Sequence, residues 1–228
     1  MNTSIIEDIT KSPLRRSLYH FTRVSNLQAI ANLDSLYSSA FLSPEFSRGI
    51  RRSEARHIYV NDQSIVLNAH LRIQPEMMDP DTTEEQFRAC LDHHVFLWPT
   101  ERDCLAMANM YSRREPNESF AILQFAAYEL LADHFATVKL SKYDSGSSPR
   151  YPHRTSYRKS CRMFLPLESF RQITDRLVPT KPSEIKEVLV EDKLGPLSKY
   201  LQTIYCSEVL QVPIMWRPLV KPLIIHNA

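Results

Sequence analysis

The chain has 228 residues, of which 43% are hydrophobic and 24% are charged, and its formal net charge is +2. This length suits one globular domain, residues 1–228, and so small a charge gives no general signal for nucleic-acid binding. The whole chain contains 3 glycines. It therefore lacks the Gly-rich motifs of a Rossmann dinucleotide site or a P-loop, which need closely spaced glycines beside the phosphates.

Cysteine and histidine spacing gives no signal for a metal site. The 4 cysteines are far apart, with no CxxC pair, and His93 and His94 are adjacent, so their side chains diverge. We expect reduced thiols in a cytoplasmic protein and no bound metal. The first residues lack the apolar core of a signal peptide, and no run of about 18 apolar residues predicts a membrane span.

The first fifth of the chain predicts one strand and one helix. Residues 1–17 are expected to be a polar lead-in, and the apolar residues 18–22 to form a strand. Ser25 precedes Leu27 and Ile30, which recur at helical spacing, so a helix capped by Ser25 is expected.

The next part of the chain predicts a basic loop followed by a hairpin. Residues 43–56 are polar and rich in arginine, as expected for a loop. Residues 57–60 and 64–73 have the composition of strands, and they flank the turn-like trio at 61–63.

Two capped helices are expected on either side of a short strand. Thr82 and Glu85 form a capping box ahead of one helix. Thr100 is in position to cap a second helix that runs to about Tyr111, and residues 95–98 between the two helices form a strand candidate.

The second half of the chain mixes strands with helices. Its expected elements are strands at 119–125, 136–140 and 185–190, a short helical piece at 126–134, a polar loop at 141–163, a helix at 196–205 and an apolar, Pro-broken tail at 206–228. Because strands and helices do not alternate in regular βαβ units, the pattern predicts an α+β fold.

Three stretches resemble the ADP-ribosyltransferase superfamily, in particular its DarT-like branch. Leu18-Tyr19-His20-Phe21-Thr22, followed by a helix that contains NLxxI, is similar to the opening LYHxT motif. HHVFLWPTERDCLAM resembles the middle motif, and IKEVLV, at 185–190, resembles the last one. VNDQSIVL, SKYDSGSSP and FLPLESF are similar to segments of an uncharacterised bacterial family expected to share this fold. The resemblance covers about residues 18–202.

The resemblance implies a split β-sheet core with flanking helices, and NAD as co-substrate, bound without a Gly-rich loop. His20 matches the residue that bonds a ribose hydroxyl, a role that suits imidazole because it both donates and accepts. Glu187 matches the acidic residue that bonds the nicotinamide ribose and stabilises the charge developing there. Glu184 is the alternative acid.

Further site residues follow from the same motifs. Arg102 corresponds to the Arg of the middle motif and is expected to be catalytic, whereas Tyr19, Thr22 and Trp98 are expected to contact NAD. The uncharacterised family alone points to four more candidates, of which the first two are cofactor contacts: Asp62, Gln63, Ser145 and Gly146.

The function that the resemblance implies is NAD-dependent transfer of ADP-ribose to a macromolecule. Two basic clusters, at 48–56 and 150–162, suit a DNA or RNA acceptor, and a protein acceptor stays open. DarT-like relatives imply a toxin or phage-defence role with an antitoxin protein as partner. The alternative is a degenerate module that binds nucleotide or protein without transfer. An RNA 2′-phosphotransferase shares the opening motif, but its additional Arg and His motifs have no match here.

Overall fold

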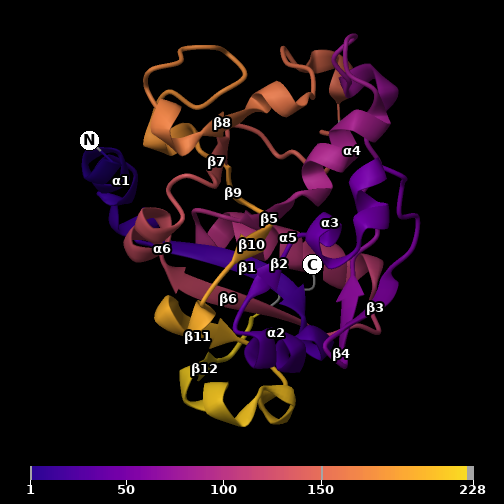
Figure 1. The fold of residues 1–228 in the computed structure, drawn as a ribbon, viewed down its shortest axis with the longest axis vertical. Helices are drawn as coiled ribbons and strands as arrows, with labels where there is room; N and C mark the ends of the chain where they lie inside the picture. Colours follow the sequence, from indigo (N-terminus) through magenta and orange to yellow (C-terminus); the bar gives the residue numbers. More distant parts are fainter. Residues whose placement is uncertain (1, 150, 225–228) are drawn as a thin grey trace.

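The computed structural model describes residues 2–149 and 151–224, and its architecture is α+β, as predicted (Figure 1). Two four-stranded sheets form the centre of the molecule. One has the strand order β1 (Ser17–Arg23), β6 (Phe120–Ala126), β11 (Leu201–Tyr205), β12 (Val220–Lys221). The other has the order β5 (His94–Leu97), β9 (Glu187–Glu191), β7 (Val138–Ser141), β8 (Phe164–Pro166).

The two sheets meet at one isolated bridge. The backbone amide of Tyr19, on β1, donates to the carbonyl of Trp98 over 2.9 Å, and the amide of Trp98 returns a bond of 2.8 Å. The core is therefore two sheets joined at the edge strands β1 and β5, which agrees with the split sheet that was expected. Two smaller pairs accompany them: β2 (Leu36–Tyr37) with β10 (Lys193–Leu194), and the hairpin of β3 (Arg56–Val60) and β4 (Gln63–Leu67).

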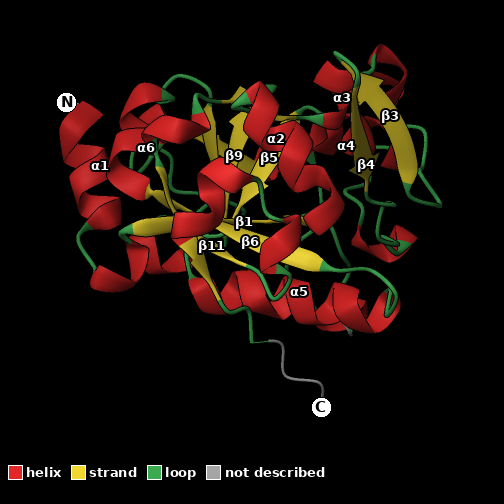
Figure 2. Ribbon diagram, turned by 90° about the horizontal axis from the view of Figure 1, so that it is seen from below, coloured by secondary structure: helices red, strands yellow, loops and turns green. Residues whose placement is uncertain are grey.

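The alternation of side chains along β1 separates two environments. Tyr19 and Phe21 pack on α5 (Glu101–Arg114), which lies along this face of the sheet in Figure 2. Leu18 points to the other face and joins the main core. Because successive residues of a strand face opposite sides, His20 lies opposite Tyr19. Thr100 caps α5 as predicted, since its hydroxyl accepts a bond from the amide of Asp103.

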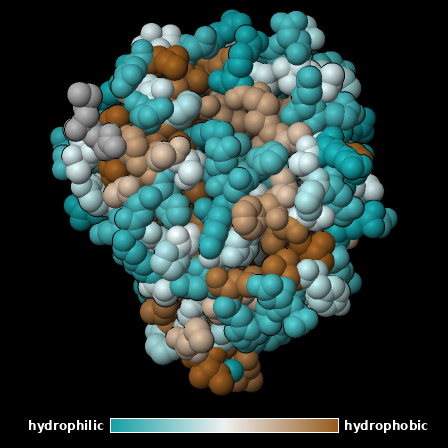
Figure 3. All heavy atoms as spheres, in the orientation of Figure 1, coloured by the Kyte–Doolittle hydropathy of each residue, from teal (hydrophilic) through white to brown (hydrophobic). Residues whose placement is uncertain are grey.

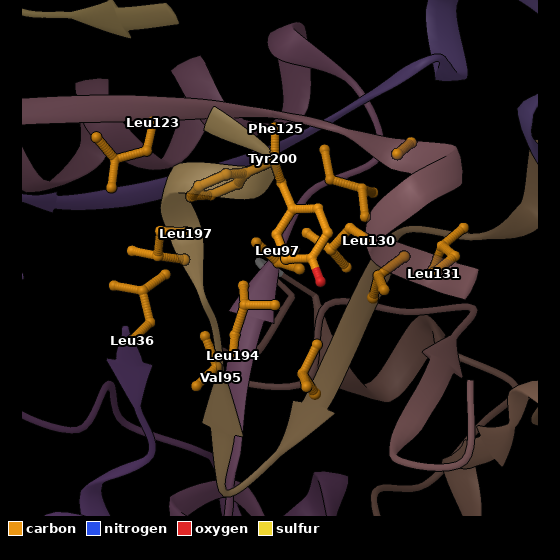
Figure 4. Close-up of a cluster of buried hydrophobic side chains, with 14 of the residues drawn as sticks. Leu36, Val95, Leu97, Leu123, Phe125, Leu130, Leu131, Leu194, Leu197 and Tyr200 are labelled. Atoms are coloured by element: carbon orange, nitrogen blue, oxygen red, sulfur yellow. The ribbon is translucent and has the colours of Figure 1, made fainter. Parts of the chain in front are cut away.

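The main core fills the space between the two sheets. Figure 4 shows side chains from β5, β6, α6 (Ala127–Asp133) and the segment around Leu197 converging on one apolar cluster. Leu97, Leu123, Phe125 and Leu130 are fully buried there. Burial on this scale is the main stabilising contribution to the fold, and it fixes the position of β5 relative to β1.

The predicted polar lead-in is wrong, because residues Asn2–Thr10 form the helix α1. Ile6 and Ile9 are 1% and 3% exposed and belong to the main core. They are spaced three residues apart, so they share one face of a helix. This helix packs on α6, beside which it lies in Figure 1.

The predicted helix at 196–205 is also wrong. Leu197–Lys199 forms a single 3-10 turn, after which the chain enters the strand β11. Ile204 and Tyr205 pair with Leu123 and Ile122 of β6, so β11 extends the first sheet. β-Branched and aromatic residues at its end favour a strand, and burial against β6 decides against the helical alternative.

Several element boundaries differ from the prediction by one or more residues. α2 (Leu27–Leu33) begins after Asn26, so Ser25 is not its cap. α4 (Glu84–Asp92) is capped by the pair Thr83 and Gln86 rather than by Thr82 and Glu85. β4 ends at Leu67 rather than at residue 73, and β9 begins at Glu187 rather than at residue 185. A short helix, α3 (Ser39–Leu42), was not predicted.

Part of the apolar tail packs on the core. Trp216, in the turn Ile214–Leu219, is 6% exposed and belongs to the main core. Leu210 and Ile214 are 84% and 78% exposed, and apolar side chains gather at this lower end of the molecule in Figure 3. Residues 225–228 of the predicted tail lie outside the described residues.

Candidate functional site

A cavity of about 280 Å³ lies where β1 of the first sheet approaches β5 and β9 of the second. Its wall includes side chains from elements that are far apart in the sequence. They include His20, Thr22, Arg52, Trp98 and Glu187.

His20 reaches across the gap between the two sheets. Its Nδ1 is 2.9 Å from the carbonyl oxygen of Phe96 on β5, and because a carbonyl only accepts, Nδ1 carries the proton. Burial lowers the pKa of His20 to about 4, although the bond to Phe96 acts in the opposite direction. At neutral pH the ring is therefore uncharged, and its Nε2 is an acceptor.

Glu187, the first residue of β9, is 3% exposed and belongs to the cavity wall. Its carboxylate accepts bonds from the Ser145 amide, at 3.1 Å, and from the Ser145 hydroxyl, at 2.6 Å. Burial, reinforced by the nearby charge of Asp144, raises the pKa of Glu187 to about 8. This acid is therefore poised to exchange a proton near neutral pH.

Glu184 has a different environment. It lies in the 3-10 turn Pro182–Glu184, not on the strand, and is absent from the walls of the cavities described here. Its carboxylate accepts from the Thr180 amide at 2.8 Å and pairs with Lys142 at 3.2 Å. The Thr180 amide bond is the main reason that the pKa of Glu184 falls to about 2. Of the two alternative acids, the structure brings Glu187 to the cavity.

Arg52 is a buried cation in the cavity wall, within residues 43–56 that were expected to form a loop. It is 8% exposed, and its guanidinium donates to Asp92 at 2.8 Å and lies over the Phe46 ring. His70 Nε2 is 3.1 Å from the same Asp92 oxygen. Although burial opposes it, the bond from His70 and the charge of Arg52 hold the pKa of Asp92 below its usual value.

A second cavity, of about 380 Å³, adjoins the first. The two share the side chains of Trp98, Met107, Asp144 and Glu187. Trp98 and Glu187 thus line both cavities. Such an arrangement suits a reaction between two bound molecules at one acid.

The predicted site residues fall into two groups. His20, Thr22, Trp98, Gly146 and Glu187 line the first cavity. Ser145 contacts Glu187 directly.

The others are not brought to the cavity. Arg102 is 88% exposed on the first turn of α5, where it lies 4.0 Å from Asp103. Tyr19 faces α5 because it alternates with His20. Asp62 and Gln63 lie at the turn of the β3–β4 hairpin, and Gln63 accepts a bond from Asn32 there.

The two basic clusters also differ. Arg48, Arg51 and Arg56 of the first are exposed around the buried Arg52. In the second, Lys159 is fully buried, Arg162 pairs with Asp79 at 2.8 Å, and Arg150 lies outside the described residues. Of the described residues of this cluster, Lys159 therefore contributes nothing to a basic surface.

Across residues 2–149 and 151–224, no group of three or more His, Cys, Asp or Glu side chains is placed to hold a metal ion. In the same residues, no helix combines the length and the apolar character required to cross a membrane.

The sequence pattern of a family described as "Family of unknown function (DUF7002)" matches residues 16–201, and the chain belongs to this family. A comparison with curated proteins found no match. Among solved structures, Thermus sp. 2.9 DarT in complex with NAD+ is similar, with 16% identity, a TM-score of 0.45, and coverage of 92% of this chain and 94% of that chain. Thermus sp. 2.9 DarT in complex with ADP-ribosylated ssDNA has 13% identity, a TM-score of 0.41, and coverage of 92% and 93%.

Proposed function

We propose that this chain is an NAD-dependent ADP-ribosyltransferase that acts on a macromolecule. The meeting of His20 and Glu187 at one cavity carries the proposal, although 167 positions (187 − 20) separate them in the sequence. The first and last motifs of the resemblance predicted both residues for one site. A fold that brings two such distant residues to the wall of one cavity supports the motif assignment.

The side chains of the first cavity fit NAD as co-substrate. NAD would supply the ADP-ribosyl group, and nicotinamide would leave as its bond to the ribose breaks. The neutral His20 ring presents Nε2 to a ribose hydroxyl, since Nδ1 is held by Phe96. Arg52, although paired with Asp92, places a guanidinium in the wall for the pyrophosphate, and Trp98 offers an aromatic face. No Gly-rich loop is required for these contacts.

Glu187 carries the transfer step in this proposal. Its carboxylate stabilises the positive charge that develops on the ribose as nicotinamide leaves. A nucleophile of the acceptor then forms the new bond to the ribose, and Glu187 takes up the proton that the nucleophile loses. The raised pKa of Glu187 suits a group that must hold this proton.

We propose nucleic acid as the acceptor. Arg48, Arg51 and Arg56 are exposed beside Arg52, so a positive surface adjoins the cavity. The second cavity has an apolar wall of Trp98, Met107 and Met110, on which a flat base could stack. Its charged lining is mixed, with the lysines Lys142 and Lys186 and the acids Asp103, Asp144 and Glu187, so the exposed arginines are the groups that suit an anionic backbone.

Labelled NAD tests the proposal. The purified chain is incubated with NAD that carries label in its adenosine part, together with separate pools of DNA, RNA and protein. We expect label on single-stranded nucleic acid, with release of an equal amount of nicotinamide. Label in no pool, together with identical behaviour of Glu187→Ala and the unaltered chain, would refute transfer. Label on the protein pool alone would keep transfer and reject the nucleic-acid acceptor.

A nucleotide-binding or protein-binding module that has lost transfer is the second candidate, and the burial of Glu187 favours it. With a pKa of about 8, this acid is mostly protonated at pH 7, and its oxygens are already bonded to Ser145. NAD binding without nicotinamide release at any pH up to 9 would select this candidate.

The biological setting in our proposal rests on the sequence resemblance alone. It comprises a toxin or phage-defence role in the cytoplasm and an antitoxin protein as partner. Expression in a bacterial host checks it: growth should stop with the unaltered chain, continue with Glu187→Gln, and be restored by the protein of a neighbouring gene. Unimpaired growth with an active transferase would exclude the toxin role.

A further inference from the structure

Lys159 is a buried ammonium group that none of the motifs assigned to the site. Its side chain is fully buried, although it belongs to a stretch whose charged residues were expected to lie on the surface. Its Nζ donates to two backbone carbonyls, those of Asp144 at 2.6 Å and Ser145 at 2.8 Å. Fully buried lysines are rare unless their charge is compensated, so a specific role is expected.

The two carbonyls that Lys159 binds belong to the segment that holds Glu187. Ser145 donates its amide and its hydroxyl to the Glu187 carboxylate. A chain of contacts therefore runs from the ammonium of Lys159, through Ser145, to the acid in the cavity wall. The stacked rings of Tyr143 and Tyr157, with centroids 3.8 Å apart, fasten the two ends of the same loop together.

We propose that Lys159 is a positioning residue for Glu187: it fixes the turn at Asp144 and Ser145, and its positive charge favours the ionised form of the Glu187 carboxylate over the protonated form. This inference rests on the proposed function where it concerns transfer. Its structural part concerns only the geometry and ionisation of Glu187, which are measurable without NAD.

The charges around Glu187 determine which effect of Lys159 is expected. Asp144 raises the pKa of Glu187, whereas Lys159 and the Ser145 bonds lower it. Tyr157 stays neutral because burial raises its pKa to about 12, and the buried His20 is neutral too. Burial also lowers the pKa of Lys159 to about 8. Lys159 and Glu187 therefore titrate in the same pH range.

The test is an NMR titration of the Glu187 side-chain carboxyl carbon in the unaltered chain and in Lys159→Met. Because an opposite charge is lost, we expect the pKa of Glu187 to rise by about 1 unit or more in the variant. If Lys159 serves only as a structural staple, its loss opens the loop to water, and the pKa of Glu187 falls toward its ordinary value. A fall, or no change, overturns the proposal.

Lys139→Met is the matched control. Lys139, on β7, pairs with Glu191 at 3.4 Å and lines neither of the two cavities described above. Its loss removes one positive charge from the same sheet, so the pKa of Glu187 should stay within about 0.3 units of the unaltered value. A shift as large as that of Lys159→Met would mean a general charge effect and would overturn the specific role.

A reciprocal measurement covers the outcome in which Lys159→Met does not fold. In Glu187→Gln the ammonium loses one of its two negative neighbours, the other being Asp144, so the pKa of Lys159 should fall by about 1 unit. The carbon next to Nζ reports this titration. An unchanged pKa contradicts the coupling.

Kinetics separates this inference from the proposed function. If both hold, the acidic limb of the rate profile of Lys159→Met moves to higher pH by the same amount as the pKa of Glu187. A shift in the NMR titration without any transferase activity would support the positioning role and reject transfer. Activity without a shift would do the reverse.

Discussion

The imidazole of His20 and the carboxylate of Glu187 line the same cavity, although they belong to different sheets. His20 lies on β1, whose backbone meets the end of β5 at the bridge between Tyr19 and Trp98. Glu187 begins β9, which pairs with β5. The strand β5 therefore connects the two residues: its carbonyl at Phe96 orients His20, and its pairing with β9 fixes Glu187.

Removing the His20 ring should weaken NAD binding. We expect His20→Ala to raise the Kd about tenfold, since one hydrogen bond to a neutral group contributes roughly 1 kcal/mol and the Phe96 carbonyl loses its donor. Titration calorimetry with NAD measures this. His57→Ala is the control, because His57 is exposed on β3. If the two variants bound NAD with equal affinity, His20 would not contact the co-substrate.

The two candidate acids should behave differently. Glu187→Gln keeps an acceptor for Ser145 but cannot ionise, so we expect nicotinamide release to slow by about 100-fold or more. Glu184→Gln loses a charge that pairs with Lys142 near the surface and should keep the rate within about threefold. If nicotinamide release slowed more in Glu184→Gln than in Glu187→Gln, Glu184 would be the catalytic acid.

The sequence predicts the motif strands well because their signals are local. Residues 18–22 and 95–98 are short apolar stretches with aromatic residues, and they fall in β1 and β5 except for Trp98, which follows β5. The segment at 196–205 was misjudged because its strand exists only through pairing with β6, about 80 residues earlier. Conversely, α1 had a readable signal in the spacing of Ile6 and Ile9, which the polar character of the surrounding residues obscured.

Motif matching pointed to Arg102, whereas the arginine that lines the cavity is Arg52. Arg102 was chosen because it follows the Pro of the middle motif, yet it lies on the exposed first turn of α5. Arg52 looked like one arginine of a solvated basic run. Its burial depends on Asp92, which is 40 positions away, and on the Phe46 ring. No local pattern distinguishes it from Arg51 beside it, so only the folded chain identifies it.

These two arginines also give a test. Arg52→Ala should lower NAD affinity at least tenfold and destabilise the fold by about 3–5 kcal/mol, because the buried charge of Asp92 loses its partner. Arg102→Ala should change neither quantity measurably. Denaturant unfolding gives the stability, and calorimetry below the transition gives the affinity. Unaltered NAD binding by folded Arg52→Ala would exclude the cation from the site.

The rate of transfer should increase with pH. The ionised form of Glu187 is the active one in our proposal, and its pKa is about 8. We therefore expect nicotinamide release to rise through pH 7–9 and to level off above that range. A rate that is flat from pH 5 to 9 would show that ionisation of Glu187 does not limit the reaction.

Stability should depend on pH through the same group, with a sign that can be worked out. The pKa of Glu187 is about 8 in the folded chain, above its ordinary value of 4.5. The folded state therefore holds this proton more tightly than the unfolded state, and stability falls as pH rises from about 4.5 through 8. Glu187→Gln removes this cost, so its Tm at pH 9 should exceed that of the unaltered chain by about 2–4 °C or more, with a smaller difference at pH 5.

Glu184→Gln should show the opposite sign. The pKa of Glu184 is lowered to about 2, chiefly by the Thr180 amide, so its ionised form stabilises the fold above the ordinary value of 4.5. Its loss should lower the Tm slightly at pH 7 and not at pH 2, because the group is partly exposed and screened by solvent. Scanning calorimetry over this pH range measures both variants.

If Glu187→Gln were no more stable than the unaltered chain at pH 9, the Glu187 carboxylate would be better solvated than its burial indicates. The pH dependence expected for transfer would then fail with it.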